Sequence, residues 1–391
     1  MFLFTSESVS EGHPDKICDQ LSDTLLDAFL AKDPQSRVAV ECFITTGLVV
    51  VGGEVTTNAQ VDVQDIVRKK IEAIGYTNPD VGLDAKSCAV LVVLNRQSPD
   101  IAQGVNENDG AFKEQGAGDQ GLTFGYACNQ TDAYMPLPIM LSHQLVFAIA
   151  QARKNNVLSY LRPDSKAQVT VEYNDARQPI RVSTVVVSTQ HHPSVSHEKI
   201  QEDIQAHIIN KVIPSELMPE PPTIYINPTG RFVVGGPQGD AGLTGRKIIV
   251  DTYGGWIPHG GGAFSGKDPS KIDRSAAYMG RYVAKNCVAA GLCDEMEIQI
   301  AYAIGVAAPV SIKLNTFGTS ELSNDDLLKI INEAFGFKPK EIIESLNLLQ
   351  PIYEKTAAYG HFGRSDVEFP WESLNKVQQL KECRQTLLAS A

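Results

Sequence analysis

The sequence lacks the features that mark a secreted or membrane-spanning protein. Its seven cysteines are odd in number and scattered, with no C-x-x-C pair, which favours buried, reduced thiols in a reducing cytosol. The opening residues MFLFTSE have no basic segment followed by a long apolar core, so they predict no signal peptide. No apolar run approaches the roughly 18 residues that a membrane span requires. We therefore expect a soluble, cytoplasmic protein.

Basic charge is also scarce. Lys and Arg number 34 against 46 Asp and Glu, which gives a formal net charge of −12. This balance argues against a protein that binds nucleic acid or an anionic membrane, because such proteins usually carry a basic excess. The 43% hydrophobic and 20% charged residues are typical of a folded globular chain. Its 391 residues are enough for two or three domains.

Hydrophobic periodicity predicts a mixture of helices and strands. From Pro14 to about Lys32 apolar residues recur every four positions, and proline suits the first helical position. Further helices are predicted at Val63–Ile74, Pro138–Lys154, His197–Val212, Ser270–Ala290, Asn324–Ala334 and Lys340–Leu348. Strands are predicted at Arg37–Ile44, Leu48–Thr57, Cys88–Leu94, Gln168–Tyr173, Ile180–Ser188, Thr223–Ile226, Phe232–Val234, Lys247–Val250, Glu297–Ala303 and Val310–Leu314.

Along the chain these elements form three comparable groups, each with paired strands and helices. That order indicates α+β units rather than one doubly wound parallel sheet. Between Arg96 and about Leu122 the chain shows little periodicity and is rich in Gly, Asn, Gln and Asp. Loops of this length are uncommon in compact domains and usually serve as lids, binding loops or linkers. We favour a mobile lid, and a plain domain linker is the alternative.

Residues 229–285 reverse the overall charge. They contain eight basic residues against four acidic ones, together with many glycines, which let backbone N–H groups approach phosphate oxygens. The stretch therefore predicts a site for a polyanion, with a solvated basic face as the alternative. Within it, Gly261–Lys267 has the G-x-x-x-x-G-K spacing of a phosphate loop. Asp268 replaces the expected Ser or Thr and no clear strand precedes the loop, so a different kind of phosphate site is favoured.

Three further residues carry types suited to phosphate chemistry. Asp15 and Asp273 are candidate magnesium ligands, because magnesium takes one or two carboxylates plus substrate phosphates. Taken singly, each aspartate is more often a helix-end or surface residue. His13 lies at a predicted helix N-terminus, where free N–H groups and the helix dipole favour an anion. A simple helix cap is the alternative for His13.

Four segments together resemble the S-adenosylmethionine synthetase (methionine adenosyltransferase) family in its bacterial form. They are Thr5–Asp19, Gly116–Gly125, Asn227–Gly255 and Gly260–Ala277, within a collinear match from about Phe4 to Trp371. The resemblance implies three similar α+β domains related by pseudo-threefold symmetry, each a sheet with helices on one face. It places them at residues 1–101, 113–231 and 232–391. It also implies a homo-oligomer, a dimer of dimers with active sites at the dimer interface.

The resemblance also implies a role for individual residues. The catalytic residues would be His13, Lys166, Arg246 and Lys267. The ATP contacts would be His13, Asp164, Lys166, Arg231, Phe232, Asp240, Arg246, Lys247, Ala263 and Lys267. The methionine contacts would be Glu54, Gln97, Asp119, Asp240 and Lys271. Asp15 and Asp273 would hold two Mg²⁺ ions and Glu41 one K⁺ ion in each site, and Gln97 to about Glu107 would form a mobile loop.

The chemistry that the resemblance implies suits these residue types. Methionine sulfur would attack C5′ of ATP and expel the whole triphosphate, which is then hydrolysed to pyrophosphate and phosphate. A thioether carries no proton, so positioning and preorganised cations matter more than a general base. The rival readings are an ATP-dependent phosphotransferase, based on Gly261–Lys267, and a non-catalytic nucleotide sensor. A catalytically weak family member is a further alternative, which the intact His13, Asp15 and Lys267 argue against.

Overall fold

The computed structural model describes residues 1–98 and 114–390. Most of the predicted lid lies outside these residues. The strands are β1 Phe2–Val9, β2 Arg37–Thr45, β3 Leu48–Thr56, β4 Thr77–Asn78, β5 Leu83–Asp84, β6 Ala89–Asn95, β7 Gly121–Cys128, β8 Leu161–Tyr173, β9 Pro179–His191, β10 Thr223–Ile226, β11 Gly242–Leu243, β12 Glu295–Tyr302 and β13 Ser311–Asn315. The α-helices are α1 Pro14–Leu30, α2 Val63–Ile74, α4 Leu137–Lys154, α5 His197–Ile204, α6 Asn210–Val212, α7 Ile248–Asp251, α8 Ile272–Ala289, α9 Asn324–Ala334, α10 Pro339–Ser345 and α11 Val377–Ser390.

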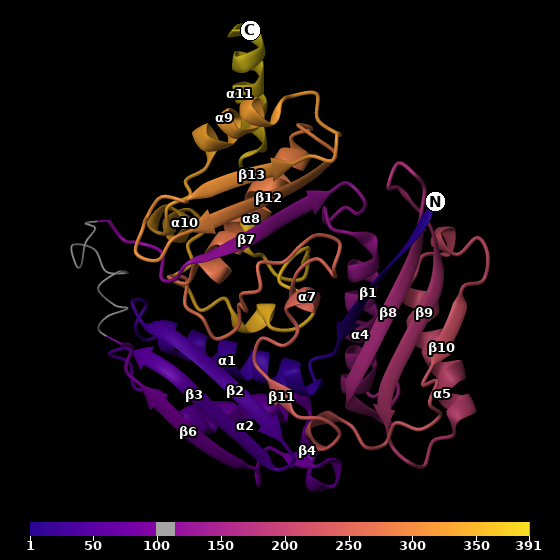
Figure 1. Ribbon diagram of the computed structural model, residues 1–391. Helices are drawn as coiled ribbons and strands as arrows, with labels where there is room; N and C mark the ends of the chain where they lie inside the picture. The colour runs from indigo at the N-terminus through magenta and orange to yellow at the C-terminus, as the bar shows by residue number, and fades with distance from the viewer. Residues whose placement is uncertain (99–113, 391) are drawn as a thin grey trace.

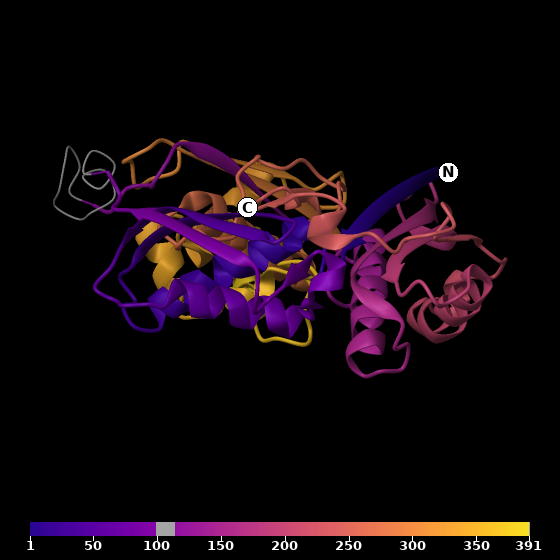
Figure 2. The ribbon, with the colours of Figure 1, turned by 90° about the horizontal axis from the view of Figure 1, so that it is seen from below.

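Three sheets are arranged around the middle of the molecule (Figure 1). Their strand orders are β1-β8-β9-β10, β11-β2-β3-β6 and β13-β12-β7. Each sheet packs against one long helix: α4 contacts β1 and β8, α1 contacts β2, and α8 contacts β7 and β12. Figure 2 shows the helices gathered on one side of the strands. The predicted α+β class with three units is therefore confirmed.

Every one of the three sheets takes a strand from a distant part of the chain. β1 pairs with β8 along its whole length, from Phe2 opposite Tyr173 to Val9 opposite Lys166. In the same way β11 adds to β2, and β7 adds to β12. None of these three sheets is thus confined to one of the spans 1–101, 113–231 and 232–391, and those boundaries themselves stay a prediction.

Most predicted elements are present, and the helix α1 shows why. Its apolar stripe Ile17, Leu21 and Leu25 is completely buried, and each such side chain contributes about 1.5–3 kcal/mol on burial. Gly75 ends α2 with a φ of 110°, as the sequence pattern predicts. The predicted helix His197–Val212 contains a π-helical turn at Gln205–Ile209 between α5 and α6.

Two predicted strands are wrong, and five strands and a helix were missed. Lys247–Val250 forms the start of the short helix α7, in which the N–H of Asp251 donates to the carbonyl of Lys247. Its β-branched run indicated a strand, but strand propensity yields to tertiary context. Phe232–Val234 is irregular. The carbonyl of Phe232 accepts the backbone N–H of His191, but the carbonyl of Val233 accepts the side chains of Arg162 and Gln190 in place of a neighbouring strand. The missed elements are the strands β1, β4, β5, β7 and β11 and the helix α11.

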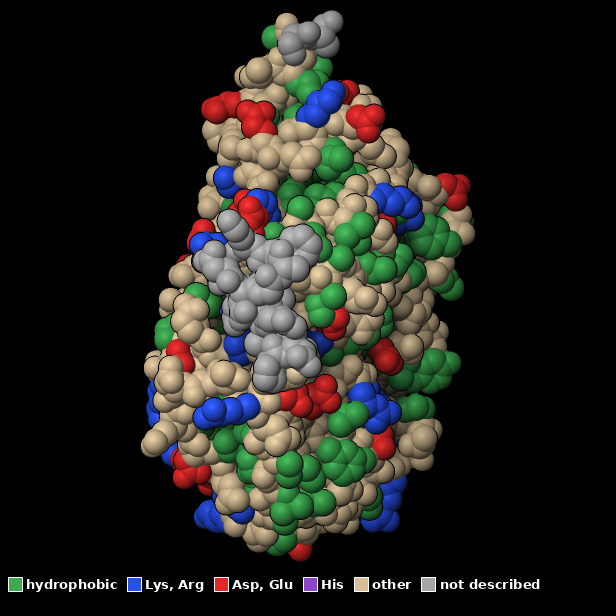
Figure 3. All heavy atoms as spheres, turned by 60° about the vertical axis from the view of Figure 1, so that its left-hand side comes forward, with side chains coloured by type: hydrophobic (Ala, Val, Ile, Leu, Met, Phe, Trp, Pro, Cys, Tyr) green, Lys and Arg blue, Asp and Glu red, His purple; other side chains and the backbone are tan. Residues whose placement is uncertain are grey.

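The sheet faces opposite the helices carry exposed apolar side chains. Alternation along β2 directs Val40 and Cys42 towards α1 and leaves Glu41 and Phe43 on the outer face. Leu91 and Val93 on β6 are 53% and 60% exposed. Figure 3 shows hydrophobic side chains gathered in patches, with charged groups scattered between them. Among the described residues, no helix is both long and apolar enough to cross a membrane.

The close approach of β7 and α8 depends on two glycines. A Cβ added at Gly125 would lie 2.0 Å from the carbonyl carbon of Gly280, so neither backbone has room for a side chain there. A Cβ added at Gly52 of β3, in contrast, would meet only one atom within 4 Å, at 3.8 Å. Gly125 and Gly52 can therefore be compared directly, because both are strand glycines and only Gly125 lacks room for a side chain.

We predict that Gly125→Ala destabilises the fold by about 1–3 kcal/mol, the usual cost of overpacking, because α8 must move away from β7. Gly52→Ala should leave stability almost unchanged. Thermal and urea unfolding of the purified variants measures both. Equal melting temperatures for the two variants would show that the contact between Gly125 and Gly280 does not limit the packing of α8.

Candidate active site

His13 caps the N-terminus of α1. Its Nδ1 accepts the backbone N–H of Asp15 at 3.1 Å, with Pro14 in the first helical position. Burial, followed by the positive charges of Lys247 and Lys166, lowers the pKa of His13 to about 3. The imidazole is therefore neutral near pH 7 and, with Nδ1 accepting, carries its proton on Nε2. His13 can thus cap α1 and also donate a hydrogen bond to an anion, because the cap leaves Nε2–H as a donor.

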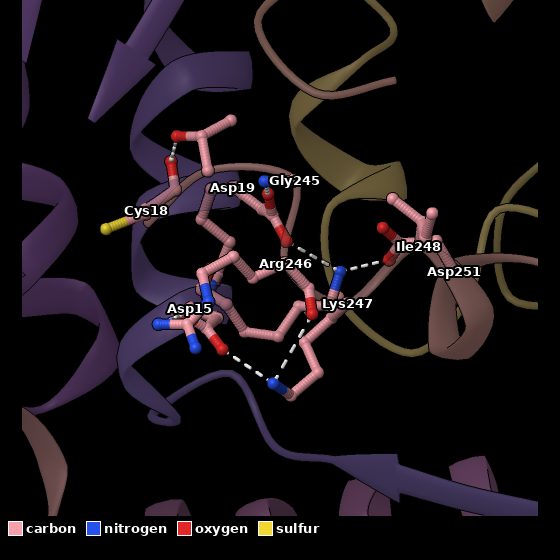
Figure 4. Close-up of polar contacts among 12 residues, drawn as sticks. Asp15, Cys18, Asp19, Gly245, Arg246, Lys247, Ile248 and Asp251 are labelled. Carbon is pink, nitrogen blue, oxygen red and sulfur yellow. Dashed lines mark hydrogen bonds and ion pairs between the residues drawn. The ribbon is translucent and has the colours of Figure 1, made fainter. Parts of the chain in front are cut away.

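Asp15 holds the basic segment against this helix end. Its Oδ2 accepts Lys247 Nζ at 2.6 Å, its Oδ1 accepts the N–H of Leu243 at 3.0 Å, and Arg246 NH1 lies 3.9 Å from Oδ1. Burial opposes ionisation of this carboxyl, but the hydrogen bonds from Lys247 and Leu243 outweigh it and lower the pKa of Asp15. Figure 4 shows Asp15 and Lys247 directed towards each other. The carboxylate is therefore ionised and paired with cations.

A row of four aspartates on α1 continues this arrangement. They are spaced by four residues, so they lie on one side of the helix. Besides Asp15, Asp19 accepts the N–H of Gly245 at 2.8 Å, and Asp23 accepts that of Gly266 at 2.8 Å. Asp27 accepts the N–H groups of Tyr353 and Glu354. Asp15, Asp19 and Asp23 thus fix the glycine-rich loops on one helix, and the D-x₃-D-x₃-D-x₃-D spacing was the signal that could have revealed the row.

The edge of β2 that faces away from β3 also binds the glycine-rich loops. Gly242 and Leu243 of β11 pair with Ile44 and Phe43. Further along that strand, Val40 N–H donates to the carbonyl of Gly266 at 3.0 Å. The 242–268 segment is thus attached at both ends to one strand, and the basic residues between lie beside α1.

A second charged group lies at the start of α8. Lys267 Nζ is 2.6 Å from Asp273 Oδ2, and Lys271 Nζ contacts Asp268 Oδ2. A Cβ added at Gly118 would lie 2.9 Å from the carbonyl oxygen of Ser270, which brings Asp119 beside this helix start. The Gly261–Lys267 segment is an irregular loop, and the next helix begins only at Ile272. It therefore lacks the strand–loop–helix geometry of a true phosphate loop.

Asp164, on β8, lies near the charged group formed by Asp15, Arg246 and Lys247. It is buried, and its Oδ2 accepts the N–H of Gly236 at 2.9 Å, while Oδ1 has no hydrogen-bond partner among the residues that the structure describes. Burial raises the pKa of Asp164 to about 6 in spite of that hydrogen bond. Lys166, two residues along β8, is exposed and contributes to the lowered pKa of His13. The ring of Phe232 lies against Gly235, where an added Cβ would meet it at 2.5 Å.

The remaining sequence-predicted residues are less closely gathered. Glu41 and Glu54 are exposed on the outer face of β2 and β3, and Gln97 N–H donates to Thr56 Oγ1 at 3.2 Å. Glu54 lies opposite Ala39, which bridges to Lys267, so a row across the sheet connects Glu54 to the second group. Arg231 and Asp240 are exposed. Ala263 lies beside Gly245, whose added Cβ would approach the Ala263 Cβ to 2.5 Å.

Comparison with known protein families accounts for nearly the whole chain. The N-terminal, central and C-terminal domains of S-adenosylmethionine synthetase match residues 1–99, 114–232 and 234–373. The S-adenosylmethionine synthase of Clostridium tetani is 61% identical over 386 residues, which cover 97% of this chain and 98% of that protein. That of Petrotoga mobilis is 59% identical over 392 residues, with the same coverage.

The chain belongs to the S-adenosylmethionine synthetase family. This assignment confirms the sequence prediction of a methionine adenosyltransferase, an enzyme of the transferase class. The cysteines also agree with the sequence reading. All seven are free thiols, and six of them are buried, while Cys383 is half-buried.

Sequence reasoning missed a set of buried residues in this synthetase. Lys16, Asp19 and Asp251 form ion pairs in the interior, and Asp23 pairs with Arg274 through contacts of 2.6 and 2.8 Å. The side chains of Asp23 and Arg274 have no exposed surface. The signal for them was weak, because an isolated Lys or Asp in a helix is usually exposed.

We predict that His13 of this synthetase, free of substrate and metal, remains neutral from pH 8 to about pH 5 with its proton on Nε2. Burial, Lys247 and Lys166 all disfavour the imidazolium, so its pKa lies below that range. Nitrogen-detected NMR of ¹⁵N-histidine-labelled protein, assigned with a His13→Gln variant, measures the tautomer. A protonated His13 ring at pH 6 would contradict the buried, capped geometry.

Proposed function

We propose that this chain joins L-methionine to the adenosyl group of ATP at the basic segment 242–273 and the N-terminus of α1. The tripolyphosphate so formed is then hydrolysed to pyrophosphate and phosphate. One observation carries the proposal: three cations, Arg246, Lys247 and Lys267, are directed at carboxylates beside two helix N-termini. Helix N-termini and cations together bind polyphosphates.

The reaction is a displacement at carbon. The methionine sulfur forms a bond to C5′ while the C5′–O bond breaks, and the triphosphate leaves with the electron pair as a sulfonium forms. Because the thioether has no proton to lose, the chain's own contribution is to align the reactants and to stabilise the leaving charge. His13 donates Nε2–H to that charge as a neutral group. Lys166, Arg246 and Lys267 stabilise it as cations.

The proposed binding residues contact either ATP or methionine. The proposed ATP contacts are His13, Asp164, Lys166, Arg231, Phe232, Asp240, Arg246, Lys247, Ala263 and Lys267. The proposed methionine contacts are Glu54, Gln97, Asp119, Asp240 and Lys271. Support comes from the row that leads from Glu54 through Ala39 to Lys267, and from the position of Asp119 beside Ser270 and Lys271.

The donor set suits magnesium better than a transition metal. Asp15 and Asp273 supply hard carboxylate oxygens, and the described residues contain no group of three or more His, Cys, Asp or Glu side chains placed to hold a metal. Magnesium takes one or two carboxylates and completes its shell with water and substrate phosphates. We assign two Mg²⁺ ions to each site, held by Asp15 and Asp273, and one K⁺ ion to Glu41. Bound magnesium neutralises charge on the triphosphate.

The exposed outer sheet faces support a homo-oligomer. Leu91 and Val93 on β6 and Phe43 on β2 form part of an apolar surface on which Glu41 and Glu54 also lie. Apolar surface of this kind marks an interface. We propose that two copies pack these faces together with the active sites between them, and that two such dimers form the tetramer. The reduced cysteines are consistent with a cytoplasmic location.

The products separate this function from its rivals. With ATP, methionine, Mg²⁺ and K⁺, the purified protein should release S-adenosylmethionine, pyrophosphate and phosphate, each dependent on methionine. Chromatography of nucleosides and phosphates measures them. ADP without a sulfonium product would indicate a phosphotransferase, and tight ATP binding without turnover a sensor.

The variant His13→Ala sharpens this test. It should fold normally but slow adenosyl transfer by about 10²-fold or more, comparable with the loss of one oxyanion donor. Single-turnover measurement with saturating substrates isolates that step. Near-normal transfer by His13→Ala would remove the imidazole from the mechanism while leaving the overall reaction in place.

We predict that Asp273→Asn raises the Mg²⁺ concentration needed for half-maximal activity by about tenfold or more, because a neutral amide is a weaker ligand than a carboxylate. The matched control is Asp326→Asn. Asp326 likewise lies in the first turn of a helix and pairs with a lysine, Lys329 at 2.9 Å, but lies outside the proposed site. Titration with Mg²⁺ measures this concentration for both variants. An equal Mg²⁺ dependence of their activities would refute the metal assignment at Asp273.

A further inference from the structure

A buried lysine lies next to the proposed site without being part of it. The side chain of Lys16 has no exposed surface, although it directly follows Asp15 in α1. Its Nζ contacts Asp19 Oδ2 at 3.0 Å and also contacts Asp251 Oδ1. Lys16 thus links α1 to α7, and Figure 4 shows its two partners, Asp19 and Asp251. Because it is enclosed by protein, Lys16 cannot touch a substrate.

The two carboxylates that Lys16 holds fix both ends of one short segment. Asp19 Oδ1 accepts the N–H of Gly245 at 2.8 Å, which anchors the start of the segment 245–251. Asp251 is itself the last residue of α7, and its N–H donates to the carbonyl of Lys247 at 2.9 Å. Through Asp19 and Asp251, a single ammonium thus connects the first and last residues of a seven-residue stretch.

The proposed triphosphate cations lie within this stretch. Arg246 and Lys247 follow Gly245, and both are directed at Asp15. Gly245 adopts a φ of +79° and lies against Ala263, so the turn before Arg246 tolerates little adjustment. Where the two cations lie is therefore set by the positions of Gly245 and Asp251.

Stability alone is a weak explanation for the Asp251 contact. Asp19 already pairs with Lys16 within the same helix. Enclosing a second carboxylate is costly, and buried ion pairs often stabilise a fold no better than apolar side chains of similar size. What Asp251 adds is a connection from α1 to a segment 235 residues away in the sequence.

We propose that Lys16 is a positioning residue that, through Asp19 and Asp251, holds the segment 245–251 so that Arg246 and Lys247 face the triphosphate. This inference rests on the proposed function, in which those two cations bind the triphosphate. Lys16 acts only through the backbone of this segment and takes no part in bond making.

Asp251→Asn tests the inference, because it keeps the side-chain size while removing the charge that pairs with Lys16. In the full-length protein with Mg²⁺, we expect the dissociation constant of inorganic tripolyphosphate to rise about tenfold or more and kcat to fall by a similar factor. The KM for methionine should change less than twofold. Calorimetric titration and steady-state kinetics measure these quantities.

The matched control is Glu372→Gln. Glu372 is also a buried carboxylate that pairs with two cations, Arg281 at 3.0 Å and Lys285 at 2.7 Å, but these partners lie on α8 and not in the segment 245–251. This variant should lose thermal stability and retain normal tripolyphosphate binding. If Asp251→Asn does not fold, Asp19→Asn replaces it, with weakened tripolyphosphate binding again expected.

The outcomes separate the two proposals. Weakened tripolyphosphate binding in Asp251→Asn, but not in Glu372→Gln, supports the positioning role. If both variants lose only stability while the wild type makes S-adenosylmethionine, the positioning role is refuted and the proposed function stands. If the wild type binds no tripolyphosphate, the positioning role fails together with the proposed triphosphate contacts.

Discussion

The glycine-rich loops of this synthetase depend on carboxylates that accept their backbone N–H groups. Three aspartates on α1, Asp15, Asp19 and Asp23, accept N–H groups of loop residues more than 200 positions away. A loop rich in glycine has many accessible conformations and few side chains to pack. The helix supplies rigidity instead, since acceptors spaced by four residues form one straight row. The proposed site is therefore as ordered as the helix that supports it.

Carboxylates also offset the repulsion between the cations of the proposed site. The site must gather Arg246, Lys247 and Lys267 to bind a triphosphate, yet these cations would repel one another in an empty site. Asp15 pairs with the first two, and Asp273 pairs with the third. His13 stays neutral in this field because burial and the neighbouring lysines disfavour its protonated form. An imidazole that donates through Nε2 without adding charge is consistent with the proposed reaction, which requires no general base.

The interwoven sheets explain how one chain brings these groups together. β1 leads directly towards His13 while pairing along β8, the strand that carries Asp164 and Lys166. β11 pairs with β2 and delivers Leu243 to Asp15. β7 follows Asp119 and pairs with β12, beside the helix that carries Asp273. Each exchanged strand thus lies next to a residue of the proposed site, which is assembled where the three units meet.

The sequence by itself determined the local elements and the family. α1, β2 and β3 follow from periodicity within a few residues, and the long motifs around His13, Asp119 and Lys267 indicated the S-adenosylmethionine synthetase family. Only the tertiary structure decided that Lys247–Val250 leads into a helical turn and that Lys16 lies in the interior. The physical reason is that these features depend on partners, such as Asp251 for Lys16, that are remote in sequence. Periodicity reports which face of an element is buried, but not which distant N–H group or carboxylate will meet it there.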